Sequence, residues 1–144
     1  PSVLDDLGLV SAVRSMCEEF EERTRITVNL RSSRFPNRLP PEVELSLFRI
    51  IQEVLNNVEQ HSQATKLALQ IQQKNSHLLV KIKDNGKGFD PLGVQKKRSR
   101  ARGYGLDGIR ERVATIGGRL ELHTELKKGV EIQIKIPLEK QASP

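Results

Sequence analysis

The chain has 144 residues, of which 36% are hydrophobic and 29% charged, as is typical of one soluble globular domain rather than a disordered segment. Its net charge of +6 raises nucleic acid as a partner, but residues 96–102 alone hold five positive charges and no negative ones, which favours polyanion binding at one spot. No stretch approaches the roughly 20 apolar residues of a membrane-spanning helix, and the single Cys17 cannot form an internal disulfide, so we expect a cytoplasmic domain without membrane contact.

The first half of the chain predicts two helices and a strand. Asp5 and Asp6 can cap a helix that runs to about Arg25, whose inner face carries Leu9, Val10, Val13, Met16, Cys17 and Phe20. Residues 26–30 alternate as a strand, and 31–41 form a connector. A second helix begins at Pro40 and Pro41, with apolar residues at helical spacing: Val43, Leu47, Ile50, Ile51, Val54, Leu55 and Val58.

The second half predicts two hairpins around a loop and a third helix. Strands at 66–72 and 78–83 meet at a turn over 74–76. Residues 90–102 show no periodicity and predict a mobile, functional loop. A helix over 104–116 ends at Gly117 and Gly118, and a last hairpin joins strands 119–125 and 130–137 through a turn at 127–129. This order predicts one α+β domain, a two-layer α/β sandwich with helices on one face of a mixed sheet.

The second predicted helix carries a polar stripe. Glu53, Asn57 and His61 fall at i, i+4 and i+8, so they project from one side of a helix. An amide oxygen beside a carboxylate suits Mg²⁺, which takes oxygen ligands and keeps several waters. A solvated polar face explains the same spacing, and the spacing alone does not separate the two interpretations.

Asp84 follows an apolar strand and precedes Gly86 and Gly88. Glycines permit positive φ angles and a close approach of backbone to a ligand, and a buried carboxylate at a strand end can accept the exocyclic amine of adenine. The alternative is an ordinary Asp-Asn-Gly turn, but no strand returns after Gly88.

A second glycine pattern opens the third predicted helix, with Gly103, Gly105 and Gly108 at G-x-G-x-x-G spacing. The free N–H groups and dipole of a helix start favour an anion. The spacing matches the dinucleotide-binding fingerprint, yet the required N-terminal βαβ unit is missing. His77 and His123 have no partner at metal-ligand spacing, which favours structural roles.

Together these segments resemble the three nucleotide-binding boxes of sensor histidine kinases. FRIIQEVLNNVEQHSQAT (48–65) is similar to the N box, DNGKGFD (84–90) to the G1 box and GYGLDGI (103–109) to the G2 box. The nitrate/nitrite-sensor type resembles the chain most, and PSVLDDLGL (1–9) looks like the stretch that joins its phosphoacceptor helices to the catalytic domain. The resemblance covers residues 1–138 and implies the Bergerat ATP-binding fold of the GHKL superfamily.

The resemblance also implies roles for matching positions. Asn57 would ligate Mg²⁺ on the triphosphate of ATP, and Glu53 would hold a metal-bound water or act as a base. Asp84 would read the adenine amine. The remaining nucleotide-binding positions would be His61 at the end of the N box, Gly86 and Gly88 in the adenine pocket, and Gly103, Tyr104, Gly105, Leu106 and Gly108 around the lid, with Gly108 packed at the helix start.

Two positions depart from the family pattern. Gln60 stands where many members carry a basic residue, so a phosphate contact is lost or supplied by the loop. Val130 stands where the family often has threonine, so we expect the water-mediated support that this hydroxyl gives to the adenine-reading aspartate to be absent.

No phosphoacceptor helix is recognisable, so the resemblance implies a catalytic domain (1–138, with 1–8 a linker remnant and 139–144 a disordered tail) of a larger kinase. Its implied partners are its own dimerisation and phosphoacceptor domain, through which the full protein is a homodimer, and a response regulator with a LuxR-class DNA-binding domain.

Three alternatives stay open from the sequence. One is another GHKL ATPase or an anti-sigma-type serine kinase. Another is a degenerate domain that binds nucleotide only for regulation. The third is a basic nucleic-acid-binding module, which the lack of interleaved aromatic residues disfavours; we expect no direct contact with nucleic acid.

Overall fold

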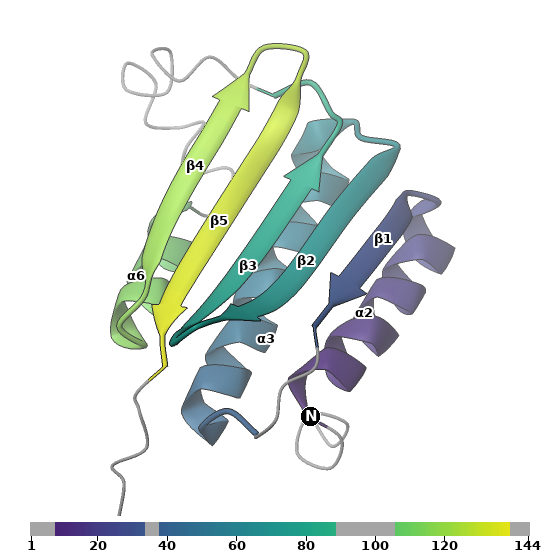
Figure 1. Cartoon of the computed structure of the whole chain (residues 1–144). Coiled ribbons are helices and arrows are strands. Elements are labelled where there is room, and N and C mark those ends of the chain that lie inside the picture. Colours follow the sequence, from purple (N-terminus) through teal and green to yellow (C-terminus); the bar gives the residue numbers. More distant parts are fainter. Residues whose placement is uncertain (1–7, 34–37, 89–105, 139–144) are drawn as a thin grey trace, which may run out of the picture.

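The computed structural model describes residues 8–33, 38–88 and 106–138. They form a five-stranded sheet in the order β1-β2-β3-β5-β4 and three α-helices, which lie behind one face of the sheet (Figure 1). β1 runs parallel to β2, and every other neighbouring pair is antiparallel. The predicted two-layer α+β sandwich with a mixed sheet is confirmed.

The first helix is shorter than predicted at its start. α2 spans Leu9–Thr24, and its N-cap is Gly8 at φ 87°, so the predicted start is wrong, and the cap at Asp5 and Asp6 lies outside the described residues. Ala12 takes a core position, whereas Val10 is only half-buried. Cys17 packs in the core as predicted, and burial raises the pKa of its thiol to about 11.

The second helix changes its winding before it ends. α3 spans Pro41–Asn57, and the chain continues as one π-helical turn, η1, over Val58–Ser62. Pro41 at the first helical position fits its fixed φ, since this position has no intrahelical N–H partner. Single π turns inside or after α-helices occur frequently at functional sites.

Four of the five strands are longer than predicted, and β4 has the predicted bounds. β1 spans Thr27–Ser32, β2 Lys66–Lys74, β3 His77–Asp84, β4 Arg119–Glu125 and β5 Gly129–Pro137. Sequence periodicity missed the strand ends because polar end residues still pair across the ladder, for example Lys74 with His77. Alternate residues of β2, β3 and β5 face the helices, and the core between the two layers is mostly aliphatic, with Phe20 and Phe48 as its aromatic members.

The last helix, α6, spans Leu106–Thr115, and the predicted start at Tyr104 lies outside the described residues. Its end is the predicted glycine pair. Gly117 takes a φ of 74°, its N–H donates to Ala114 O at 3.0 Å, and the Gly118 N–H donates to Val113 O at 2.9 Å. This is a Schellman C-cap, and it turns the chain directly into β4.

Candidate functional site

A pocket lies between the helical layer and the middle of the sheet. Its walls come from α3, η1, β3, β5 and the first residue of α6, and eight residues line it: Val54, Asn57, Val58, Ile82, Asp84, Leu106, Val130 and Ile132. Six of them are apolar, while an amide and a carboxylate supply the polar groups. An apolar slot with few polar groups is typical of a small-molecule site.

Asp84 is the buried charge of this pocket, with an exposed fraction of only 4%. Its Oδ1 accepts hydrogen bonds from the Gly86 N–H at 2.8 Å and from the Val130 N–H at 3.4 Å. Burial raises the pKa of Asp84, and these two hydrogen bonds oppose that rise. Both bonds from described residues end on Oδ1, which leaves Oδ2 for a donor on a ligand.

The loop after Asp84 fits only with glycines. A Cβ at Gly86 would lie 2.2 Å from Ser62 O, and one at Gly88, whose φ is 58°, would lie 2.1 Å from Glu125 O. The Lys87 N–H donates to Ser62 O at 2.7 Å, and Lys87 O accepts from the Lys127 N–H. The loop is therefore clamped between η1 and the β4–β5 turn, which explains the predicted need for both glycines.

Asn85 fastens the same loop to the start of β2. Its Oδ1 accepts from the N–H groups of Thr65 and Lys66 at 2.9 and 3.0 Å, and its Nδ2 donates to Thr65 Oγ1. The Asn85 N–H donates to Lys66 O at 3.2 Å. Side-chain bonds of this kind replace ladder bonds where the chain leaves a strand.

The predicted polar stripe divides between two environments. Asn57 is buried, with an exposed fraction of 7%, and lines the pocket together with Asp84. Glu53 is exposed one turn earlier and is not among the lining residues. His61 is half-buried on η1, where the π turn replaces the α-helical spacing assumed from the sequence. The structure thus brings Asn57 and Asp84 together, but not all three residues of the stripe.

The second glycine pattern is only partly described. Gly103, Tyr104, Gly105 and the basic loop lie outside the described residues. Leu106 is buried and closes one side of the pocket. Gly108 is exposed, and among the described residues nothing lies within 4 Å of a Cβ there, so the expected packing of Gly108 at the helix start stays a prediction.

Two backbone contacts of Asp84 escaped sequence reasoning, one of them at Val130, which the sequence analysis named only for the hydroxyl that it lacks. Val130 supports Asp84 through its backbone N–H, whatever side chain it carries. Gly129 was interpreted only as a turn residue, yet its φ is 86° and a Cβ there would lie 2.0 Å from Asp84 O. A glycine directly before a strand was the one available signal for this close approach.

The described residues include no complete set of His, Cys, Asp or Glu ligands for a metal ion, since no group of three or more such side chains among them could hold one. His77 begins β3 and pairs with Pro137, and the exposed His123 ring lies 3.3 Å from Glu121 Oε2. Neither residue lines the pocket.

None of the helices in the described ranges is long and apolar enough to cross a membrane.

Comparison of the sequence with known proteins identifies a family of ATPases. A sequence model of the family "Histidine kinase-, DNA gyrase B-, and HSP90-like ATPase" matches residues 42–140. The histidine-protein kinase/phosphatase DegS of Brevibacillus brevis is 38% identical over 135 residues, covering 94% of this chain and 34% of that protein. The sensor histidine kinase ComP of Bacillus subtilis is 36% identical over 138 residues, covering 96% of this chain and 18% of that protein. The chain thus spans about a third or less of these relatives.

Solved structures share the fold. The histidine kinase AdeS of Acinetobacter baumannii superposes with a TM-score of 0.71 at 16% identity, covering 96% of this chain and 74% of that one. The catalytic domain of the histidine kinase ThkA gives 0.65 at 17% identity, covering 90% and 89%. With its pocket, its glycine loop and the match over 42–140, the chain belongs to the family of histidine kinase-, DNA gyrase B- and HSP90-like ATPases, as a catalytic domain of the kind found in sensor histidine kinases.

Proposed function

We propose that this domain binds Mg-ATP and donates the γ-phosphoryl group to a histidine on a helical domain outside this chain, for relay to an aspartate of a response regulator. The observation that carries the proposal is the buried Asp84 carboxylate at the end of an apolar pocket that Asn57 also lines. Catalysis by such a domain consists of positioning the phosphates and stabilising their charge, rather than covalent chemistry by the protein.

The pocket fits adenine on chemical grounds. The two faces of the adenine ring would pack against the aliphatic walls from β3, β5 and α3. Oδ2 of Asp84 accepts the exocyclic amine, which adenine has at the position where guanine carries a carbonyl. A carboxylate facing that carbonyl repels it and leaves both acceptors unpaired, so Asp84 selects ATP over GTP.

The metal requirement also fits the residues present. Mg²⁺ usually keeps several waters and is held by one or two protein oxygens plus substrate phosphates. Asn57 Oδ1 would be the protein ligand of the metal, and Glu53 would orient a water of its shell or accept a proton. The metal, when bound, neutralises charge on the phosphates. As the resemblance implies, His61, Leu106 and Gly108 would contribute to nucleotide binding together with the G2 residues Gly103, Tyr104 and Gly105.

The proposed phosphoryl transfer needs no reactant other than ATP and the accepting histidine. A histidine ring nitrogen of the partner domain attacks the γ-phosphorus, a P–N bond forms, the bond to the bridging oxygen breaks, and ADP leaves. The proposed partners are the dimerisation and phosphoacceptor domain of the homodimeric full protein and a response regulator. The finer assignment, to the nitrate/nitrite-sensor type with a LuxR-class regulator, rests on the three sequence boxes.

The alternative within the same superfamily is another ATPase or an anti-sigma-type serine kinase. The similarity to proteins described as sensor histidine kinases supports the histidine kinase instead. Phosphorylation of a serine on an added partner, with none on a separate phosphoacceptor helix, would favour the alternative.

Calorimetric titration of ATP, ADP and GTP, each with and without Mg²⁺, tests the proposal. We expect micromolar binding that prefers adenine. Asn57→Ala is expected to remove the dependence on Mg²⁺, and Asp84→Asn to reduce the preference for ATP over GTP by at least about tenfold. Absence of nucleotide binding by the unmodified domain would overturn the proposal, and equal weakening by Asn57→Ala with and without Mg²⁺ would refute the metal-ligand role.

A further inference from the structure

Ser62, the last residue of η1, has an exposed fraction of 0% although its side chain is polar. Its Oγ donates to Val58 O at 2.7 Å and accepts from the Ala64 N–H at 3.0 Å. The hydroxyl thus closes the π turn on one side and the exit into β2 on the other. Both bonds are buried or half-buried, so removing the hydroxyl leaves two backbone groups without this partner.

The carbonyl of Ser62 makes a separate contact with the adenine loop. It accepts from the Lys87 N–H at 2.7 Å, and a Cβ at Gly86 would lie 2.2 Å from it. The Gly86 N–H in turn donates to Asp84 Oδ1 at 2.8 Å. One residue therefore links the helical wall of the pocket, through Val58, to the segment that orients the Asp84 carboxylate.

We propose that Ser62 is a positioning residue for nucleotide specificity, because its hydroxyl fixes the π turn and its carbonyl thereby holds the Gly86–Lys87 segment that orients Asp84. This inference deepens the proposed function and rests on it for the identity of the ligand. The dependence of the Gly86–Lys87 segment on the Ser62 hydroxyl follows from the hydrogen bonds alone and does not need the ligand to be known.

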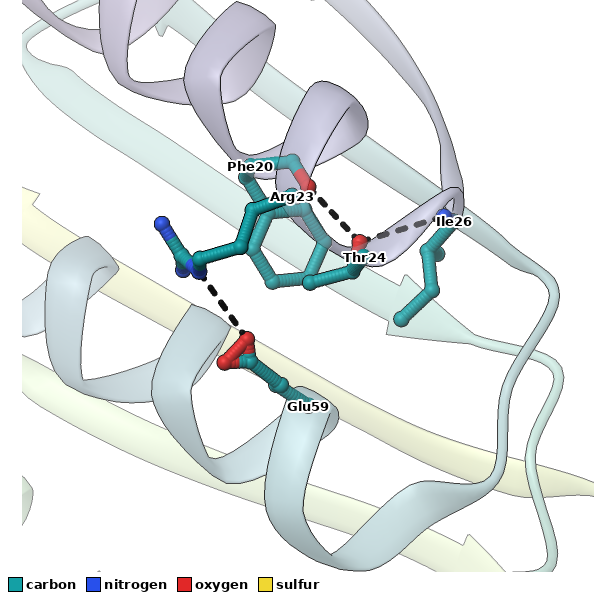
Figure 2. A network of polar contacts seen from close by, with 5 residues as sticks. All are labelled: Phe20, Arg23, Thr24, Ile26 and Glu59. Carbon is teal, nitrogen blue, oxygen red and sulfur yellow. Dashed lines mark hydrogen bonds and ion pairs between the residues drawn. The ribbon is translucent and has the colours of Figure 1, made fainter.

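The chain contains a matched control for this device. Thr24, the last residue of α2, makes the same local bonds: its Oγ1 donates to Phe20 O at 2.7 Å and accepts from the Ile26 N–H at 3.1 Å (Figure 2). A left-handed residue follows each of them, Arg25 at φ 63° and Gln63 at φ 55°. The Ser62 motif differs because its carbonyl also holds a loop of the site.

The experiment compares Ser62→Ala with Thr24→Ala in the whole 144-residue domain. Amide hydrogen exchange followed by NMR reports the Lys87 N–H. This residue is exposed, and its N–H donates to Ser62 O, a bond that should protect it from exchange. We expect protection in the unmodified domain, at least about tenfold faster exchange at Lys87 in Ser62→Ala, and no change at Lys87 in Thr24→Ala. An unprotected Lys87 N–H in the unmodified domain, or equal exchange in all three proteins, would overturn the proposal.

Calorimetry on the same proteins tests the link to specificity. Ser62→Ala is expected to weaken ATP binding at least about tenfold while GTP binding changes less, and Thr24→Ala to leave both within about twofold. Equal loss for both nucleotides, or for both variants, would refute a role in specificity. If the unmodified domain binds no nucleotide, the proposed function fails, while the exchange comparison still decides whether Ser62 holds the loop.

Discussion

At the scale of single residues, the site depends on one carboxylate that is expensive to bury. Asp84 has little access to water, and its two backbone hydrogen bonds only partly offset the cost of desolvation, so its pKa stays raised. A buried carboxylate whose pKa is shifted by desolvation is typical of a binding site. The stability of the free domain must therefore depend on the ionisation of Asp84.

Asp84→Asn is expected to change how stability responds to pH. Because the pKa of Asp84 is raised above its ordinary value of 3.8 in the folded state, its contribution to stability is full below pH 3.8 and is lost as pH rises through the folded pKa. The asparagine variant lacks this loss and keeps an oxygen for both backbone donors. In urea unfolding, the free energy of unfolding of the variant relative to the unmodified domain should rise from about pH 4 upward. Once the pH has passed the folded pKa of Asp84, the difference should stay constant. A constant difference across the whole range would contradict the prediction.

Gly129→Ala is expected to destabilise the domain by at least about 2 kcal/mol, because it combines a positive φ with a backbone clash at Asp84 O. Gly108→Ala is the matched control. That glycine is exposed inside α6, and no described residue lies within 4 Å of a Cβ there, so alanine should stabilise the domain by up to about 1 kcal/mol. Chemical denaturation of both variants measures the contrast, and similar effects of the two substitutions would contradict it.

At the scale of elements, α2 is tied to the π turn of the site by an ion pair. Arg23 Nε lies 3.1 Å from Glu59 Oε2, and the guanidinium also lies 5.9 Å from the centre of the Phe20 ring (Figure 2). The exposed fractions of the Arg23 and Glu59 side chains are 55% and 35%. Solvent screens such a pair, so it orients the elements more than it stabilises them.

A double-mutant cycle with Arg23→Ala and Glu59→Ala should give a coupling energy of about 0.2–1 kcal/mol at low salt. The coupling should disappear in about 1 M salt, where the screening length falls to roughly 3 Å. Urea denaturation of the four proteins at two salt concentrations measures it. A coupling above about 2 kcal/mol that ignores salt would show that the pair is effectively buried.

At the scale of the whole molecule, two layers share one aliphatic core, and the sheet turns its other face away from the helices (Figure 1). Ile134 on β5 points into that core with an exposed fraction of 0%. Its neighbour Lys135 is exposed, as the alternation of a strand requires. Substitutions at these adjacent positions therefore test the layer arrangement.

Ile134→Ala is expected to cost about 2–5 kcal/mol, because it removes buried methyl groups and leaves a cavity between the layers. Lys135→Ala should stay within about 0.5 kcal/mol. Thermal and urea unfolding of the two variants provides the comparison. Comparable losses at both positions would mean that a further layer covers the other face of the sheet in solution.

The sequence by itself determined the order of elements, the fold class and the segments that form the pocket. Helical periodicity located α3, and alternation located the strands, because both depend on residues close in the chain. Asp84 and Asn57 were predicted for a similar reason, because each lies in a short motif that resembles a nucleotide-binding box.

Tertiary structure decided the contacts that orient those residues. The Val130 N–H reaches Asp84 from 46 positions away, Ser62 O holds Lys87, and Gly129 admits the Asp84 backbone. The π turn replaced the α-helical winding that the sequence predicted around His61, and burial separated Asn57 from Glu53. Each outcome depends on strand register and on packing between layers, and these are set by contacts between distant parts of the chain that no local pattern records.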